Sequence, residues 1–323
     1  MSSLPPGSQR PLATVVIVTY RSQATIESCL ESLIATDRAR VDIVVVDNSP
    51  DQATADHILA FIARRPDAPI RLLPQAVNLG FAAGCNLGAR EARGRFLMFL
   101  NPDAELLGDV VGILAAFLDG HPRAEVVGPQ IRDAGGHLTP TCRRLPTCWR
   151  IFLDATGLDR VVCGYRMLRF DHTARRLVDQ VMGACFFLRT EDFQRRGGFD
   201  ERFFIYYEEV DYCRRVLDDG GEVWFEPAAA IGHVGGASCE HAGQVAHMTA
   251  LLRESRELYF DKHFGLLPRL CVRLIDRLEG AGKAAILSVS GLLRGDARQR
   301  EKAKGFLDVA LGRGRRGRPS PPD

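Results

Sequence analysis

The stretch Thr14-Val15-Val16-Ile17-Val18-Thr19-Tyr20 decides the fold of this 323-residue chain. Four consecutive β-branched apolar residues with threonine on both sides favour a β-strand. Because the apolar run is continuous rather than alternating, both faces of the strand should be buried. Such strands belong to parallel sheets whose two faces are covered by helices. The stretch therefore predicts a central strand and an alternation of strands and helices around it.

The residues that follow show this alternation. Further strands are predicted by the apolar runs at 41–46, 70–73, 96–100 and 126–128. A helix with Ile26, Leu30, Leu33 and Ile34 on one face is predicted after the first strand, and other helices at 52–64, 82–92 and 106–119. The sequence therefore predicts an α/β fold built on a doubly wound, mostly parallel sheet.

Polar residues follow three of these strands, where parallel sheets bind their ligands. The strand ends read Thr19-Tyr20, Asp47-Asn48 and Asn101-Pro102-Asp103. Each alone is equally typical of a turn or a helix N-cap. Three at one edge favour a binding site, and a carboxylate there suits a hard divalent cation and the phosphates bound to it.

A second acidic cluster lies in the stretch Tyr206-Tyr207-Glu208-Glu209-Val210-Asp211-Tyr212. Its carboxylates follow an aromatic segment at 203–207, and burial among aromatic rings raises the pKa of a carboxylate toward that of a general base. The alternative is a solvated helix start that the helix macrodipole favours. The two acidic clusters together suggest group transfer from a phosphate-activated donor to a hydroxyl.

The segment 78–88 reads NLGFAAGCNLG and spaces its glycines four residues apart. One face of the helix that it starts is nearly bare, so it can press against the sheet or against a ligand. The segment does not read G-x-G-x-x-G, and the chain contains no G-x-x-x-x-G-K-[ST]. This excludes the Rossmann dinucleotide and P-loop interpretations.

Composition excludes other classes. The chain has 42 Lys/Arg and 40 Asp/Glu, a net charge of +2 that argues against a nucleic-acid binder. Residues 266–323 hold 13 of the basic and 6 of the acidic residues, which leaves 29 and 34 for residues 1–265. Nine scattered cysteines without a C-x-x-C pair predict reduced thiols in an intracellular protein. Neither an apolar leader nor a run of about 18 apolar residues is present, so we expect a protein that is neither exported nor integral to a membrane.

Eight motifs in order resemble the inverting glycosyltransferases of the GT-A class known as family 2, and within it the rhamnosyltransferase-like branch that builds bacterial surface polysaccharides. The resemblance spans about residues 13–265. The motifs are Val16-Ile17-Val18-Thr19-Tyr20, Val45-Val46-Asp47-Asn48-Ser49, Asn78-Leu79-Gly80-Phe81-Ala82, Asn101-Pro102-Asp103, Met182-Gly183-Ala184-Cys185, Gly198-Phe199-Asp200-Glu201 with Phe203-Phe204, Glu208-Glu209-Val210-Asp211, and Gly232-His233-Val234-Gly235-Gly236.

The resemblance implies a GT-A-like fold and a site for a nucleotide-sugar, dTDP- or UDP-linked. Residues implied to line it are Thr19, Tyr20, Asp47, Asn78, Gly80, Asn101, Gly183, Ala184 and Arg215. Gly183-Ala184-Cys185 is expected to be a strand of small residues that leaves room for a sugar, or a packed sheet element. Arg215 is expected either to reach the diphosphate or to face solvent.

The resemblance also implies a divalent cation, Mg²⁺ or Mn²⁺. Asp103 stands where the family has its D-x-D-type metal motif, and Asn101 replaces the first acidic residue. His233 is implied as the additional ligand, and an imidazole with a carboxylate fits Mn²⁺ better than Mg²⁺.

The base implied by the resemblance is Glu209, which aligns with the second residue of a Glu-Asp pair; Glu208 or Asp211 are the alternatives. The implied reaction inverts the anomeric carbon in one step through an oxocarbenium-like transition state. Two other function classes stay open, a nucleotide-sugar sensor without turnover and a metal-dependent nucleotide-sugar hydrolase or nucleotidyltransferase.

The chain lacks a Q-x-x-R-W motif, which indicates an enzyme that adds one sugar, such as rhamnose or a similar deoxysugar or hexose. The implied acceptor is a polyprenyl-linked glycan or a polysaccharide, reached at the cytoplasmic face of the membrane.

The chain divides into four predicted parts. Residues 1–12 are expected to be a disordered tail, 13–265 the catalytic domain, 266–311 an amphipathic helical extension and 312–323 a basic disordered tail. In the extension, leucines recur at helical spacing beside Arg269, Arg273 and Arg277. Two interpretations fit this pattern: a helix that packs on the catalytic domain, or in-plane attachment to an anionic membrane surface.

Overall fold

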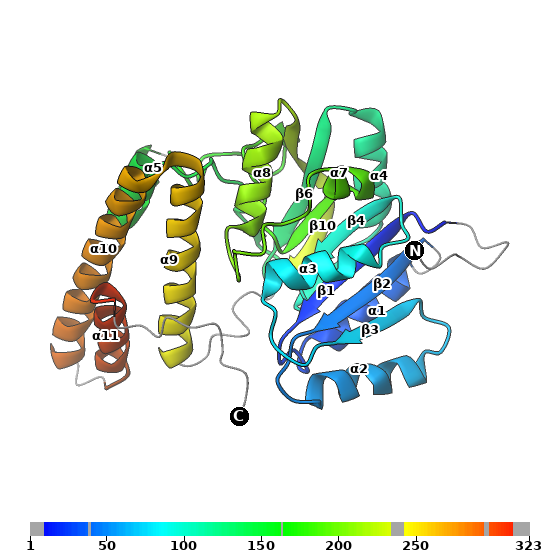
Figure 1. The fold of residues 1–323 in the computed structure, drawn as a ribbon, viewed down its shortest axis with the longest axis horizontal. Coiled ribbons are helices and arrows are strands. Elements are labelled where there is room, and N and C mark those ends of the chain that lie inside the picture. The colour runs from blue at the N-terminus through cyan, green and yellow to red at the C-terminus, as the bar shows by residue number, and fades with distance from the viewer. Residues whose placement is uncertain (1–9, 38–39, 163, 234–241, 294–296, 313–323) are drawn as a thin grey trace.

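The computed structural model of the chain describes residues 10–37, 40–162, 164–233, 242–293 and 297–312. A sheet flanked by helices forms one side of the molecule, and a group of long helices forms the other (Figure 1). The predicted tails fall almost wholly outside the described residues, and so does the end of the last motif, Val234-Gly235-Gly236.

The first half of the sheet is parallel and follows the predicted strands closely. Its strands lie in the order β3-β2-β1-β4. Their bounds are β1 (Ala13–Thr19), β2 (Val41–Asp47), β3 (Ile70–Pro74) and β4 (Phe96–Leu100). Every residue of β1, β2 and β4 is buried. Continuous apolar runs therefore form the centre of the sheet, as predicted.

The second half of the sheet brings in strands from later in the chain. β9 (Cys185–Arg189) lies between β4 and β6 (Ala124–Arg132) and runs antiparallel to both. β10 (Glu222–His233) is parallel to β6 and pairs with the short β5 (Ala104–Leu106). Two short strands, β7 (Leu138–Thr139) and β8 (Arg176–Leu177), pair with β6 and β10.

Two local predictions are corrected. Gly183 and Ala184 form a turn rather than a strand, because β9 pairs with β4 only up to Cys185, which lies opposite the last residue of β4, Leu100. The helix predicted from residue 106 begins at Val110, because residues 104–106 pair with β10 instead. The helix has its N-cap at Asp109, whose carboxylate accepts a hydrogen bond from the backbone N–H of Gly112.

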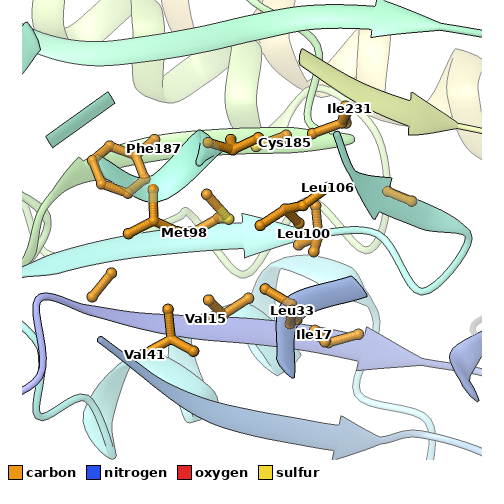
Figure 2. Close-up of a cluster of buried hydrophobic side chains, with 14 of the residues drawn as sticks. Val15, Ile17, Leu33, Val41, Met98, Leu100, Leu106, Cys185, Phe187 and Ile231 are labelled. Atoms are coloured by element: carbon orange, nitrogen blue, oxygen red, sulfur yellow. The ribbon is translucent and has the colours of Figure 1, made fainter. Parts of the chain in front are cut away.

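Helices cover both faces of the sheet, which confirms the predicted doubly wound α/β fold. One face packs against α1 (Ile26–Asp37), α2 (Ala53–Arg64) and α4 (Val110–Gly120). The other packs against α3 (Phe81–Arg90), α7 (Thr190–Arg195) and α8 (Glu208–Asp218). Figure 2 shows the first face, where Val15, Met98 and Phe187 from neighbouring strands line up in one apolar layer.

The bare face of α3 packs on the sheet. A Cβ atom added to Gly84 would lie 2.9 Å from the Val18 side chain, and one added to Gly88 would lie 2.4 Å from that of Val16. Real side chains do not approach so closely, so these glycines let the helix lie directly on β1. The spaced glycines were predicted to press against the sheet or against a ligand. Gly84 and Gly88 both pack against the sheet.

Five further helices form the C-terminal side of the molecule. They are α5 (Cys148–Thr156), α6 (Asp159–Val162), α9 (Ala242–Phe264), α10 (Leu266–Leu293) and α11 (Ala297–Ala310). The helix α10 packs against α5, α9 and α11 (Figure 1). No helix in the part of the chain that the structure describes is long and apolar enough to cross a membrane.

The helix α10 packs through the face opposite its leucines. Its buried residues are Val272, Asp276, Gly280, Ala284 and Gly291, which are mostly small or polar. The leucines of the predicted stripe face outward, with Leu267 80% and Leu278 64% exposed. The amphipathic extension therefore packs on its neighbours through one face and exposes an apolar stripe on the other. Attachment to a membrane stays a prediction.

The long helices also hold the chain just before α8. Ser255 of α9 donates a hydrogen bond to the Ile205 carbonyl at 2.7 Å, and Arg256 donates one to the Tyr207 hydroxyl at 3.0 Å. Arg256 in turn forms a buried ion pair with Asp276 of α10. The entry into α8 is therefore fixed by two helices that come later in the chain.

Replacing Arg256 by Met should destabilise the protein by about 3–5 kcal/mol, because it leaves the Asp276 carboxylate buried without its partner. Thermal unfolding should show a lower midpoint for this variant. The double variant Arg256→Met/Asp276→Leu should recover a large part of the loss, since it removes both charges. A midpoint unchanged by Arg256→Met alone would contradict the importance of this ion pair.

Candidate active site

The ends of β1 and β2 bring Thr19 and Asp47 together. The two residues are paired in the sheet register, and the Thr19 hydroxyl donates a hydrogen bond to Asp47 Oδ1 at 2.9 Å. The Ser49 hydroxyl donates to the same oxygen at 2.6 Å. Asp47 is buried, whereas Tyr20 is exposed beside it. This edge therefore holds a rigid carboxylate with a neighbouring aromatic ring, as the strand ends predicted.

Asn78 and Gly80 form a tight turn that enters α3. The Asn78 side chain accepts a hydrogen bond from the Gly80 N–H at 2.9 Å, and Gly80 has a φ of 85°, which favours glycine. A Cβ atom at Gly80 would lie 2.4 Å from the Phe204 carbonyl oxygen. Asn48, which follows Asp47 at the strand end but was not assigned a role, donates to the Gly80 carbonyl, and its buried Oδ1 has no hydrogen-bond partner among the described residues.

The end of β4 meets the end of β10 at Asp103 and His233. Asp103 Oδ1 lies 3.1 Å from His233 Nε2, and both side chains are mostly buried. Asn101 Nδ2 lies 3.3 Å from the same imidazole nitrogen. The antiparallel pairing of His233 with Ala104 brings these residues together although they are about 130 positions apart. The predicted pair of metal ligands is therefore assembled in space.

The donor atoms of this pair suit a divalent cation. Two ligands bound side by side at about 2.1–2.2 Å from a metal lie about 3 Å apart, which matches the observed separation. No group of three His, Cys, Asp or Glu residues surrounds the spot within the described chain. A cation held here would therefore keep most of its coordination positions for phosphate oxygens and water.

Glu208 and Glu209 begin α8 in enclosed surroundings. Burial raises the pKa of the Glu208 carboxyl well above its ordinary value, and the neighbouring Glu209 raises it further. Burial also raises the pKa of Glu209, although backbone hydrogen bonds and the nearby Arg143 oppose the shift. One buried oxygen of each carboxylate lacks a hydrogen-bond partner among the described residues. A raised pKa strengthens the affinity of a carboxylate for a proton, which suits a general base.

Asp211, the alternative base, has a different environment. Its carboxylate is fully buried and contacts Lys262 Nζ at 2.7 Å, His263 Nε2 at 2.8 Å and Arg215 Nε at 3.0 Å. Burial alone would raise the pKa of Asp211, but hydrogen bonds from His263 and Lys262 lower it overall. A carboxylate held by three such groups is a poor proton acceptor, which argues against Asp211 as the base.

Arg215 is likewise part of the structural framework. Besides Asp211, its guanidinium donates to the carbonyls of Arg196 at 2.8 Å and Gly198 at 2.6 Å, and it lies over the Tyr212 ring. Neither of its predicted alternatives, a contact to the diphosphate or a solvent-facing position, matches these contacts. The side chain instead ties α8 to the loop before it.

The turn at Gly183 and Ala184 lies between the segment that holds Asp103 and the Glu209 side chain. The Ala184 carbonyl accepts a hydrogen bond from the Asn101 N–H at 3.0 Å. A Cβ atom at Gly183 would lie 3.7 Å from the Glu209 carboxyl carbon. The Glu209 carboxylate therefore lies next to the backbone of Gly183. The segment around Asp103, the turn at Gly183 and Ala184, and Glu209 thus follow one another along one continuous edge.

The family model of glycosyl transferase family 2 matches residues 14–196, which is more than half of the chain. An N-acetylglucosaminyl-diphospho-decaprenol L-rhamnosyltransferase of Mycobacterium tuberculosis is 29% identical over 268 residues, which cover 78% of this chain and 85% of the relative. Rhamnosyltransferase WbbL of Escherichia coli is 24% identical over 66% of this chain and 80% of its own length.

Solved structures agree on the fold. The mannosyltransferase PcManGT from Pyrobaculum calidifontis, in complex with GDP-Man and Mn²⁺, superposes with a TM-score of 0.55 at 15% identity, over 96% of this chain and 89% of its own. GalNAc-T7 with UDP, GalNAc and Mn²⁺ superposes with a TM-score of 0.54 at 16% identity, over 80% of this chain and 52% of its own. The fold is the GT-A type, and the chain is a glycosyltransferase that belongs to glycosyl transferase family 2.

Proposed function

We propose that this glycosyltransferase moves one sugar, rhamnose or a similar deoxysugar or hexose, from a dTDP- or UDP-linked donor to a hydroxyl of a lipid-linked or polysaccharide acceptor, with inversion. The observation that carries the proposal is the continuous edge from Asp103 through Gly183 to Glu209. This edge supports the proposal because Asp103 with His233 could hold a cation and Glu209 could act as the base of the same site. The rhamnosyltransferase relative that acts on a diphospho-decaprenol acceptor supports the choice of substrates.

The donor would lie along the ends of the parallel strands. Asp47 and Thr19 would hold its nucleoside, and the orphan carbonyl oxygen of Asn48 offers an acceptor for a donor N–H group. Asp103 and His233 would hold a divalent cation, which would offset the charge that builds on the departing diphosphate. The Mn²⁺ in the neighbouring structures of the same fold is consistent with this role.

Glu209 would act on the acceptor. As the acceptor oxygen forms its bond to the anomeric carbon, the bond to the donor diphosphate breaks and its electron pair leaves with the nucleotide. Glu209 takes the proton of the acceptor hydroxyl, so no covalent enzyme intermediate is needed. Burial assists this step, because it raises the pKa of Glu209 and strengthens its affinity for the proton.

Replacing Glu209 by Gln should lower kcat by about 100-fold or more, because it removes the proton acceptor at nearly constant shape. Donor affinity should hardly change. In the wild type, kcat should fall as the pH drops through the raised pKa of Glu209, since a protonated carboxyl cannot accept a proton. Pre-steady-state assays across pH would measure both effects, with Glu208→Gln as the matched control. Loss of activity in the control and normal activity in Glu209→Gln would reverse the assignment.

Replacing Asp103 by Asn should remove the dependence of nucleotide binding on Mn²⁺, since the variant loses the charged ligand. Calorimetric titration of dTDP and UDP with and without the metal would measure this, and chelator should stop transfer by the wild type. Glu105, an exposed carboxylate two residues away, provides the control variant Glu105→Gln. Nucleotide binding that is equally tight with chelator, and in Asp103→Asn, would show that no cation is held there.

The outward stripe of α10 would attach the enzyme to the inner face of the cytoplasmic membrane, where a lipid-linked acceptor lies. Leu267, Leu274 and Leu278 are exposed, as is Arg277 beside them. Arg269 and Arg273 contribute less than the sequence suggested, because they pair with Glu257 of α9. Apolar burial would therefore provide the main attraction, and anionic lipids a smaller share.

The double variant Leu274→Glu/Leu278→Glu should stay in the supernatant with phosphatidylglycerol vesicles, while the wild type sediments and is partly released by salt. Leu59→Glu, which alters an exposed leucine of α2, is the control and should sediment normally. These substitutions are preferable to truncation after Gly265, which would also delete Asp276. A wild-type protein that remains in the supernatant at low salt would rule out membrane attachment.

A further inference from the structure

Arg143 is a cation beside the catalytic edge that the proposed chemistry does not use. It lies in the segment between β7 and α5, where its backbone N–H donates to the Gln180 carbonyl at 3.3 Å. Gln180 comes three residues before Gly183, whose backbone faces Glu209. The guanidinium carbon of Arg143 lies 5.8 Å from the centroid of the Tyr165 ring. Its positive charge also lowers the pKa of Glu209, against the effect of burial. The side chain therefore belongs to the part of the site that holds Glu209.

The charge of Arg143 is not balanced by an ion pair. Arg144 and Arg150, the nearest arginines in sequence, both approach Asp179, at 3.4 and 3.8 Å. Arg143 makes neither an ion pair nor a side-chain hydrogen bond with any residue that the structure describes. Arg143 is partly buried, and its guanidinium N–H groups donate to none of the described residues. Such a side chain is suited to bind an anionic group of a ligand.

An apolar surface lies on the helix that follows Arg143 in the sequence. The helix that follows Arg143, α5, exposes Trp149 and Phe152 in a stacked pair with ring centroids 5.6 Å apart. The first residue of α5, Cys148, donates to the Pro268 carbonyl at the start of α10, where the outward leucine stripe begins. An amphiphile lying on this surface would have its apolar chain on α5 and α10 and its polar head directed toward Arg143.

We propose that Arg143 binds the diphosphate of a prenyl-diphosphate-linked acceptor and so orients its sugar hydroxyl toward Glu209. The guanidinium fork matches two phosphate oxygens, and its position at the base side separates this diphosphate from that of the donor, which would lie at Asp103. The inference rests on the proposed function, because it assigns the acceptor class of the same site. Arg143 is thus a substrate-binding residue, distinct from the base.

The test uses farnesyl diphosphate as the probe, with the nucleotide site saturated by dTDP and Mn²⁺. Calorimetry should detect binding to the wild type, weaker binding of farnesol, and weak binding of inorganic pyrophosphate, which lacks the chain. Arg143→Gln should weaken farnesyl diphosphate binding about tenfold or more, since a charged hydrogen bond is lost, and leave farnesol binding unchanged. Arg143→Lys should retain part of the affinity. Arg144→Gln is the matched control and should bind as the wild type.

Unchanged farnesyl diphosphate affinity in Arg143→Gln would overturn the inference. So would an equal loss of farnesol binding, which would mean that the variant damages the apolar surface. If Arg143 served only to tune Glu209, the variant would shift the acid limb of the pH–rate profile and leave binding intact, which would also overturn it. Failure of the proposed function gives a different pattern, with Arg143-dependent binding of farnesyl diphosphate but no sugar transfer from any donor.

Discussion

The left-handed backbone at Tyr206 and Tyr207 is the constraint on which the catalytic side of this enzyme depends. Their φ values are 68° and 69°, a conformation that costs about 1–2 kcal/mol for each residue with a side chain. The turn makes α8 begin at once with Glu208, so the adjacent Glu209 is directed at Gly183. Without this turn the same carboxylates would sit on an ordinary solvated helix start.

The helices α9 and α10 stabilise this turn. Ser255 and Arg256 of α9 bond to its two ends, and Asp276 of α10 holds Arg256. The same helix α10 turns its leucines outward. One element therefore has two distinct faces, because its small and polar face holds Arg256 while its apolar face is exposed. In our proposal the first face supports the base and the second attaches to a membrane. Attachment and catalysis would then share a single framework.

Local sequence was enough for the regular part of the fold. The continuous apolar runs of β1, β2 and β4 predicted buried parallel strands, since only strands covered on both faces tolerate such runs. It was not enough for β5, which has only three residues and exists because β10 lies beside it. Nor could it place Arg143 near Glu209, because that proximity depends on a bridge between segments 37 residues apart.

The acidic cluster shows most clearly what each level determined. The sequence by itself determined that carboxylates would follow an aromatic segment at one edge of an α/β sheet, and it left Glu208, Glu209 and Asp211 as alternative bases. Only the tertiary structure distinguishes their surroundings, because Lys262 and His263 contact Asp211 while Glu209 lies beside the backbone of Gly183. The assignment of Glu209 as the base stays a prediction. The physical reason is that the proton affinity of a carboxylate depends on its burial and on the charges around it, and these come from residues distant in the chain.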